Sequence, residues 1–189
     1  MSDANKQTGP WTVDSLPRGV QCGEGSVITG ENAFRRYFSQ RELAIVVGDN
    51  CFLDGMQFAL GKHATLSVGD YVYGTNTVVL AEQAISIGSY VFIGFNVAIA
   101  DTDFHPLDPA QRMLDAIACS PAGRGRPRPP IPTAPVVIED DVWIGPNSTI
   151  LKGVRIGAGA FIEPGSVVTR DVPPRARVLG NPAQIVGEV

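Results

Sequence analysis

Aliphatic residues recur every six positions in the C-terminal part of the chain. The series runs through Ile138, Ile144, Ile150, Ile156, Ile162 and Val168. A helix repeats its buried face about every 3.6 residues and a strand every 2, so a strict period of six fits neither as a continuous element. It fits very short strands joined by turns, with three sides closing one triangular coil. The spacing therefore predicts an all-β fold, a parallel β-helix built from hexapeptide repeats.

The same count extends toward the N-terminus and defines the predicted domain organisation. Ile87, Ile93 and Ile99 form one coil, and an earlier coil contains Val68 and Leu80. We predict about five coils, at residues 47–67, 68–86, 87–104, 138–155 and 156–173. Residues 1–46 are predicted to form an irregular N-terminal cap, and residues 174–189 a C-terminal tail that runs back as an extended strand or a short helix. The β-helix itself is predicted to cover residues 47–173.

The count of six breaks over residues 104–135, where we predict an inserted loop. Its first part includes a helix-compatible stretch from Ala110 to Ala118, and its second part, from Pro121 to Pro135, is rich in proline and arginine. Loops this long inside a compact domain are usually functional or disordered. Because the chain leaves a rigid solenoid and returns to it in register, we interpret the loop as an arm that closes over an active site.

Composition narrows the classes of partner and the cellular compartment. The formal charge is −4 and the pI is near 5.1, whereas a nucleic-acid-binding domain calls for a basic face. No apolar run is long enough to span a membrane, and the polar start of the chain has no signal-peptide segment. The 3 cysteines are odd in number and widely spread, which argues against a disulfide framework. We therefore expect a cytoplasmic protein with no nucleic-acid or membrane partner.

His105 is the candidate catalytic residue, because it lies where the coil pattern breaks into the loop. Histidine can accept a proton from a hydroxyl or amine near neutral pH and pass it on. Asp101, Asp103 or a backbone carbonyl could fix its tautomer, and the alternative is a surface histidine capped by nearby acids. The other histidine, His63, is expected to be a solvated turn residue. Two histidines cannot supply a three-histidine zinc site, and no cysteine pair has ligand spacing, so no metal is expected.

The segment from Val136 to Val186, with its "DDVWIG" motif and the ending Gly180-Asn-Pro-Ala, resembles the C-terminal half of hexapeptide-repeat acyltransferases. The resemblance is to the branch of galactoside, maltose and antibiotic O-acetyltransferases. It implies a left-handed β-helix, a homotrimer with inter-subunit active sites, and coenzyme A bound in the groove between two subunits. It also implies that His105 is the general base that activates the acceptor.

Carried over by position, the resemblance implies further site residues. Those expected to bind the coenzyme are Gly94, Trp143, Gly145, Lys152, Thr169 and Arg170. Those expected to bind the acceptor are Asn76, Glu82, Asp103 and Arg112. Trp143 could equally be an outward aromatic that covers the loop, and a lone Lys152 is usually solvated. Pro146 and Pro164 depart from the pattern, because proline lacks the N–H that relatives can donate there.

The expected function is an acyltransferase that uses acetyl-CoA as its co-substrate. It would transfer an acetyl group to a hydroxyl or amine of a sugar, a sugar nucleotide or a similar small polar acceptor. One alternative is an antibiotic-acetylating enzyme of the same branch. Another, from a different class, is a non-catalytic β-helix assembly module, since the hexapeptide pattern specifies a fold and not an activity.

Overall fold

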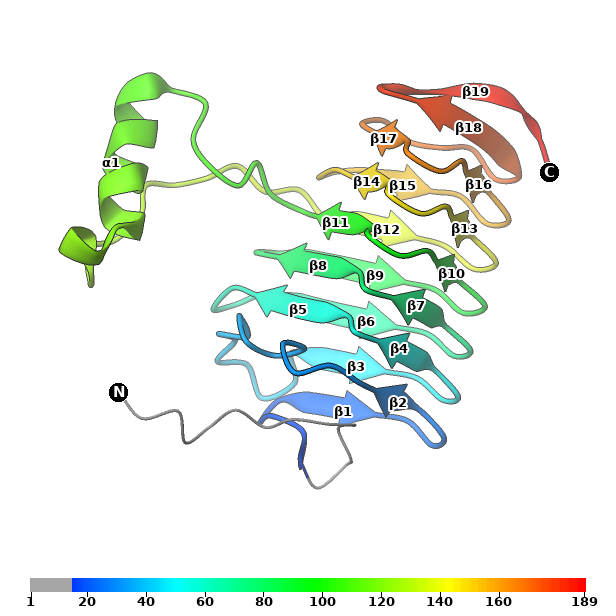
Figure 1. Ribbon diagram of the computed structural model, residues 1–189, viewed down its shortest axis with the longest axis horizontal. Helices are drawn as coiled ribbons and strands as arrows, with labels where there is room; N and C mark the ends of the chain where they lie inside the picture. The colour runs from blue at the N-terminus through cyan, green and yellow to red at the C-terminus, as the bar shows by residue number, and fades with distance from the viewer. Residues whose placement is uncertain (1–14) are drawn as a thin grey trace.

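The computed structural model describes residues 15–189, which form a parallel β-helix with a sheet along each of its three sides (Figure 1). The first sheet contains, in order, β1 (Val20–Cys22), β3 (Ile45–Val47), β6 (Thr65–Val68), β9 (Ala84–Ile87), β12 (Val136–Ile138) and β15 (Arg155–Ile156). The second contains β2 (Val27–Ile28), β4 (Phe52–Asp54), β7 (Tyr73–Thr75), β10 (Phe92–Ile93), β13 (Trp143–Ile144), β16 (Phe161–Ile162), β18 (Ala176–Gly180) and β19 (Ala183–Glu188). The third contains β5 (Gln57–Leu60), β8 (Val78–Ala81), β11 (Ala98–Ala100), β14 (Thr149–Ile150) and β17 (Val167–Val168). The predicted all-β solenoid is confirmed.

The hexapeptide series lies in the core of the solenoid. All of its members, from Ile138 to Val168, are at most 1 % exposed. Ile138 pairs in register with Ile156, and Ile144 pairs with Ile162, so each aliphatic residue stacks on its counterpart in the next coil. Burying one such side chain contributes about 1.5–3 kcal/mol. The period of six is therefore the period at which the chain turns a corner and buries its next aliphatic residue.

Two corners of the coil use left-handed backbone conformations. Between the first and second sheets these residues are Asn50, Tyr71, Tyr90 and Asp141, with φ from 55° to 60°. Between the second and third sheets they are Asn76, Asn96 and Asn147, with φ from 44° to 60°. Asparagine and aspartate adopt this region more readily than other residues with a side chain. Five of these seven corner residues are asparagine or aspartate, which therefore recur at fixed places in an otherwise apolar repeat.

The solenoid begins earlier than the hexapeptide count predicts. β1 pairs in parallel with β3, and β2 pairs with β4, so the range predicted as an irregular cap already contains part of a coil. The first sheet accordingly has six strands where about five coils were expected, and β18 extends the second sheet by one more level. The third side of this first coil is irregular, with only a bridge from Tyr37 to Leu60, so no fixed spacing identifies it. Residues 1–14 of the predicted cap lie outside the described residues.

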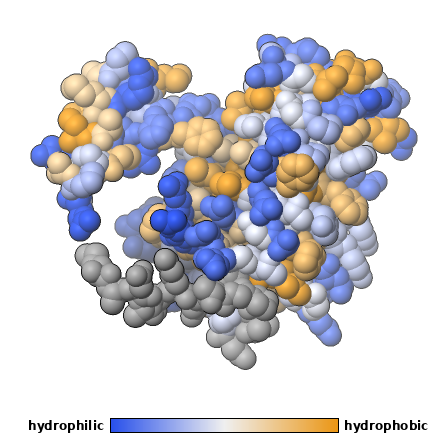
Figure 2. All heavy atoms as spheres, in the orientation of Figure 1, coloured by the Kyte–Doolittle hydropathy of each residue, from blue (hydrophilic) through white to orange (hydrophobic). Residues whose placement is uncertain are grey.

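The inserted loop forms an arm (residues 104–135) that projects from the side of the solenoid (Figure 1). It carries α1 (Pro109–Cys119), which agrees with the predicted helix-compatible stretch, and the short 3₁₀ helix η2 (Pro121–Gly123). Asp108 caps α1 by accepting a hydrogen bond from the Gln111 N–H at 2.9 Å. The space-filling view shows the arm standing apart from the body of the molecule, with an open notch between them (Figure 2).

The two legs of the arm are joined where they leave the solenoid, at a neck formed by residues 101–103 and 132–134. Thr102 and Thr133 form an antiparallel bridge. The Asp103 N–H donates to the Pro132 carbonyl at 3.2 Å, and the Ala134 N–H donates to the Asp101 carbonyl at 2.9 Å. The neck therefore returns the chain to β12 beside the point where it left β11.

The tail contains β18 and β19, which pair antiparallel, while β18 also pairs in parallel with β16. This agrees with the extended alternative predicted for the tail and places the last strand pair over the C-terminal end of the solenoid (Figure 1). Among residues 15–189, no helix has both the length and the apolar character needed to cross a membrane.

Candidate active site

His105 lies at the start of the arm, just after the neck. The residue before it, Phe104, has a φ of 64°, and the His105 N–H donates to the Asp103 carbonyl at 2.7 Å. This tight turn directs the chain away from the third sheet. The imidazole side chain remains 58 % exposed, so it is accessible to a ligand.

Asp115 of α1 orients the imidazole of His105. Its Oδ2 lies 2.6 Å from the His105 Nδ1, and its side chain is fully buried. An ionised carboxylate can only accept a hydrogen bond, so Nδ1 carries the proton and Nε2 is left as the basic atom. Neither Asp101 nor Asp103 has this role.

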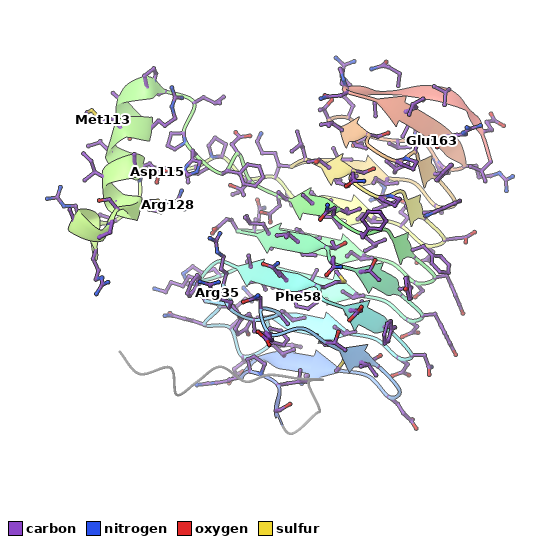
Figure 3. All side chains as sticks on the ribbon, viewed as in Figure 1. Arg35, Phe58, Met113, Asp115, Arg128 and Glu163 are labelled. Carbon is purple, nitrogen blue, oxygen red and sulfur yellow. The ribbon has the colours of Figure 1, made fainter. Side chains whose placement is uncertain are left out.

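Arg128 holds the carboxylate of Asp115 from the other leg of the arm. Its Nε donates to Oδ1 at 2.6 Å, and its Nη2 donates to Oδ2 at 3.0 Å and to the Phe104 carbonyl at 2.9 Å. These hydrogen bonds, reinforced by the contact with His105, hold the pKa of Asp115 well below its usual range despite burial. Asp115 in turn raises the pKa of Arg128. Figure 3 shows Asp115 and Arg128 close together on the arm.

Sequence reasoning did not find Asp115 or Arg128. Asp115 is the only buried residue of α1, although Met113 and Leu114 beside it are exposed. An acid on the covered face of a helix, preceded by a histidine and followed by an arginine-rich segment, is the signal that could have identified it. Spacing alone could not, because the contact depends on how the arm folds back.

Asp101 and Asp103 have structural partners. Asp101 is fully buried, and its carboxylate accepts hydrogen bonds from the backbone N–H groups of Glu82, Gln83 and Ala84 at 2.7–2.8 Å. The Asp103 carboxylate lies 3.4 Å from the Lys152 Nζ. Asp103, which was expected to bind the acceptor, therefore forms an ion pair with Lys152, which was expected to bind the coenzyme.

His105 and Glu82 line the same cleft, which has a volume of about 360 Å³. The residues around it are Arg36, Leu80, Glu82, Thr102, Phe104, His105, Cys119, Arg128 and Ile131. Desolvation and the nearby Asp101 raise the pKa of Glu82, while Arg128 opposes the shift. The cleft therefore combines a histidine with a fixed tautomer and a carboxyl group that resists ionisation.

Three of the expected coenzyme ligands follow strands of the third sheet, the sheet that leads into His105. Lys152 comes shortly after β14, and Thr169 and Arg170 come directly after β17. Because parallel strands end at the same edge of a sheet, these residues continue the edge that begins with Glu82 after β8. Thr169 and Arg170 are exposed. Their coenzyme contacts stay a prediction.

Trp143, Gly94 and Gly145 belong to the second sheet and its corner, away from the cleft of their own chain. Trp143 is exposed and stacks on Phe161 with ring centroids 4.3 Å apart, and its predicted contact with the coenzyme stays a prediction. The N–H groups of Gly94 and Gly145 donate to carbonyls of the next coil at 2.9 and 2.8 Å, so neither is available to a thioester. A Cβ on Gly94 would lie 2.6 Å from the Pro146 nitrogen, so close stacking of coils accounts for this glycine.

Asn76 and Arg112, two expected acceptor ligands, also have structural roles. Asn76 is a corner residue with a φ of 44°, at the opposite end of β8 from Glu82. The Arg112 guanidinium donates to the carbonyls of Pro106 and Leu107 at 3.3 and 2.7 Å and so fixes the turn before α1. Neither residue lines the cleft.

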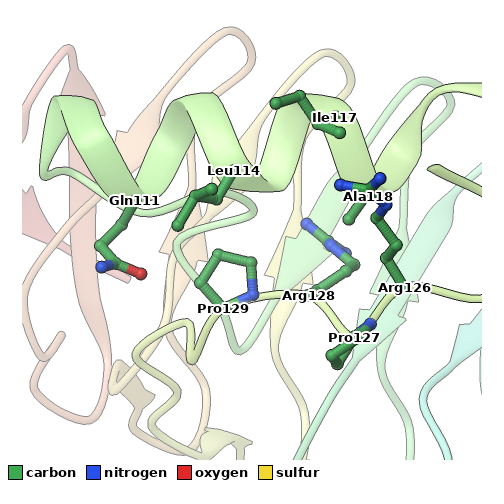
Figure 4. A pocket seen from close by; sticks show the side chains of 8 residues that line it. All are labelled: Gln111, Leu114, Ile117, Ala118, Arg126, Pro127, Arg128 and Pro129. Atoms are coloured by element: carbon green, nitrogen blue, oxygen red, sulfur yellow. The ribbon is translucent and has the colours of Figure 1, made fainter. Parts of the chain in front are cut away.

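A second hollow, of about 320 Å³, lies within the arm between α1 and residues 126–129 (Figure 4). Its lining residues are Gln111, Leu114, Ile117, Ala118, Arg126, Pro127, Arg128 and Pro129. Arg128 borders both this hollow and the cleft, so it connects the packing of the arm to the orientation of His105.

Comparisons with known proteins agree with the fold and point to a family. The family model "Bacterial transferase hexapeptide (six repeats)" matches residues 135–170. The galactoside O-acetyltransferase of Lactococcus lactis is 33 % identical over 141 residues, which are 74 % of this chain and 60 % of that protein. The chain thus spans about three fifths of the length of this curated relative.

Solved structures extend the similarity. A hexapeptide-repeat acetyltransferase from Vibrio cholerae, complexed with acetyl coenzyme A, is 34 % identical with a TM-score of 0.59, over 73 % of this chain and 67 % of that one. Another structure of that protein is 30 % identical with a TM-score of 0.59, over 90 % and 74 % of the two chains. An N-acyltransferase from Bacillus cereus shares the fold, with a TM-score of 0.69 at 15 % identity over 96 % and 91 %. The left-handed β-helix that the resemblance implies is thereby confirmed.

Proposed function

The chain belongs to the hexapeptide-repeat acetyltransferases, and on that premise we propose that it transfers an acetyl group from acetyl coenzyme A to a hydroxyl or amine of a small polar acceptor. The acceptor class we propose is a sugar, a sugar nucleotide or a similar molecule, in keeping with the galactoside O-acetyltransferase that it resembles. One observation carries the proposal: His105 lines a cleft and has its Nδ1 2.6 Å from the buried carboxylate of Asp115.

The proposed reaction begins with a proton transfer. The His105 Nε2 removes the proton from the acceptor hydroxyl or amine as that atom attacks the thioester carbonyl. The Asp115 carboxylate stabilises the imidazolium that forms, because it is held ionised by Arg128. When the tetrahedral intermediate collapses, the carbon–sulfur bond breaks and the imidazolium returns the proton to the departing thiolate. The acetylated acceptor and free coenzyme A are the products.

We place the coenzyme along the edge of the third sheet that follows β14 and β17. Thr169 and Arg170 are exposed there, and Arg170 makes no ion pair with another residue of the described range 15–189. A guanidinium in this position suits the phosphates of coenzyme A. Lys152 is held by Asp103 at 3.4 Å and would contribute its charge beside the thioester end.

We propose that the protein assembles as a homotrimer in which each arm reaches a neighbouring subunit. The support is the exposed apolar surface of the arm: the relative exposures of Leu107, Met113 and Leu114 are 78 %, 60 % and 50 %. Clustered apolar side chains of this kind mark interaction sites. If the solenoid of a neighbouring subunit covered α1, then either its second sheet, which carries Trp143, or the edge of its third sheet would face the cleft.

We assign the enzyme to the cytoplasm. Cys22, Cys51 and Cys119 are free thiols, which a reducing compartment preserves. Burial is the main cause that raises the pKa of the Cys51 and Cys22 thiols, so these two side chains are kept in the unreactive protonated form.

The test is acetyl-CoA turnover, followed as release of free thiol against a panel of sugars and nucleotide sugars. His105→Ala should lower kcat by about 10²–10⁴-fold, the range of a general base, while coenzyme A binding by calorimetry is retained. His63→Ala is the matched control, because His63 lies in an exposed turn and does not line the cleft, so this variant should keep wild-type activity.

Two results would overturn the proposal. Full activity in the His105→Ala variant would exclude this residue as the base. Absence of coenzyme A binding to the wild-type protein would instead favour a non-catalytic β-helix module.

A further inference from the structure

A further hollow adjoins the catalytic cleft on the third sheet. It has a volume of about 280 Å³ and is lined by Asn32, Arg36, Gln57, Phe58, Ala59, Val78 and Leu80. Arg36 and Leu80 line both this hollow and the cleft that contains His105. The two hollows therefore adjoin at Arg36 and Leu80, and we refer to them together as the groove; His105 lines the half that is the cleft.

Arg36 is the charged residue that the two hollows share. Within the described residues, no ion pair or side-chain hydrogen bond engages it. Arg128, the other arginine of the cleft, is committed to Asp115 at 2.6 Å. An arginine that lines a groove without a carboxylate partner can bind a planar anionic group through two parallel hydrogen bonds.

The backbone that carries Arg36 is fixed against the solenoid. Its carbonyl accepts a hydrogen bond from the Leu60 N–H at 3.1 Å, and the Phe38 N–H donates to the Leu60 carbonyl at 2.9 Å. Arg36 therefore lies one level beyond β5, and His105 follows β11, with β5 and β8 between them. Three strand spacings separate the two backbone positions, about 14 Å along the axis of the solenoid. Both residues nevertheless line the same cleft, so one bound acceptor can contact both side chains.

The two ends of the groove differ in charge. The hollow on β5 contains Arg36 as its charged residue, together with the amides of Asn32 and Gln57 and a floor that includes Phe58. The cleft end contains Glu82, which forms no ion pair with Arg36. A negative group on a bound molecule is attracted toward Arg36 and repelled from Glu82. Figure 3 shows Phe58 on β5, and at the edge of the solenoid Arg35, the residue that precedes Arg36.

We propose that the acceptor carries a carboxylate or a phosphate that binds Arg36, while its hydroxyl or amine faces His105. This rests on the proposed acetyl transfer and narrows its acceptor to anionic sugars, such as a uronic acid or a sugar phosphate. A carboxylate and a phosphate both present negatively charged oxygens that a guanidinium can bind, so Arg36 would recognise either group. Arg36 also determines which end of the acceptor reaches the imidazole.

The experiment measures binding separately from turnover. The probes are glucose, glucuronate and glucose 6-phosphate, and the matching galactose series, titrated by ligand-observed NMR in the presence of coenzyme A. Wild-type protein should bind the anionic members at least about tenfold more tightly than the neutral sugar, which corresponds to about 1.4 kcal/mol. The two anionic arms show whether a carboxylate or a phosphate is preferred.

Variants at two neighbouring arginines test the assignment. Arg36→Gln should abolish the preference for anionic sugars without changing coenzyme A binding, and Arg36→Lys should restore part of it. Arg35→Gln should keep the preference, because Arg35 is also exposed but lines neither hollow.

The inference is overturned if neutral and anionic sugars bind the wild type equally, or if Arg36→Gln retains the preference. Turnover with no preference for anions would remove the inference and leave the proposed function. Anion binding that depends on Arg36, without any acetyl transfer, would support the anion site at Arg36 and exclude the proposed function.

Discussion

Asp115→Asn tests how the arm supports catalysis, because it keeps the shape of the side chain and removes its charge. The wild-type carboxylate is fully buried and lies 2.6 Å from both the His105 Nδ1 and the Arg128 Nε. An asparagine amide can offer either an N–H or an oxygen to Nδ1. Nothing then fixes the imidazole with its proton on Nδ1, and no negative charge stabilises the imidazolium.

The expected loss follows from the strength of that hydrogen bond. A hydrogen bond to a charged group is worth about 1.5–3 kcal/mol, and each 1.36 kcal/mol changes a rate about tenfold. We therefore expect kcat to fall by about 10- to 150-fold. The KM for acetyl-CoA should change little, because Asp115 lies in the arm and not along the edge assigned to the coenzyme.

Folding of the arm must be separated from catalysis in this variant. Arg128 loses its carboxylate partner, but its side chain is 41 % exposed, so water replaces part of the interaction. The loss of stability should therefore stay below the about 3–5 kcal/mol that breaking a fully buried pair costs. Hydrogen exchange of the α1 amides measures it directly. Gln111→Ala, an exposed change on the same helix, is the control and should keep wild-type kcat.

A double variant provides the refuting result. If Asp115 acts through His105, adding Asp115→Asn to His105→Ala should lower kcat only slightly further. Independent, multiplicative losses would show that Asp115 does not work by orienting the imidazole. An Asp115→Asn variant with wild-type kcat and an ordered α1 would refute the reasoning altogether.

Further expectations concern the scaffold and the cleft. Gly94→Ala should lower the free energy of unfolding by about 1–3 kcal/mol in urea denaturation, because the new Cβ would lie 2.6 Å from the Pro146 nitrogen. Gly187→Ala, whose Cβ would meet nothing within 4 Å, should be close to neutral, and equal losses would contradict the stacking argument. Ile150→Ala should cost about 2–5 kcal/mol by the same measurement, since Ile150 is 0 % exposed; a loss below 1 kcal/mol would mean that the coil collapses around the cavity. Burial raises the pKa of Glu82, so the folded state binds its proton more tightly than the unfolded chain, and the ionised carboxyl lowers stability as pH rises. Glu82→Gln should therefore be more stable than wild type at pH 7, with the difference vanishing below about pH 4, and a difference that persists in acid would exclude this cause.

The repeat could be predicted from the sequence because one spacing rule governs both the chain and the core. Ile138, Ile144 and Ile150 each occupy one side of a coil, so the positions alone identify the architecture. The rule fails in the first coil, where β1 and β2 pair correctly but the third side is irregular. Without regular spacing on that side, the coil has no signature in the sequence.

The site could be located but not assembled from the sequence. The break at Phe104 predicts His105 as the base, and Glu82 is predicted as an acceptor ligand one coil earlier; both line the same cleft, and their roles stay predictions. Asp115 and Arg128 were missed because their contacts are made by a folded arm that has no repeat. For Asn76 and Gly94, a corner conformation and the close stacking of coils already account for the residue type, so their predicted ligand roles stay untested.

The neck has a consequence for how such a protein can change over time. Thr102 and Thr133 already hold the two legs together at the point where the chain leaves and rejoins the solenoid. The entropy of closing a loop rises only slowly with its length, and coils beyond the neck contact only their neighbours. Sequence between the legs can therefore lengthen, shorten or be replaced without moving β11 or β12 out of register. Around His105, Asp115 and Arg128, the arm can therefore gain or lose residues while the scaffold is kept, and the junction of β11 and β12 is a place where a new segment could be grafted.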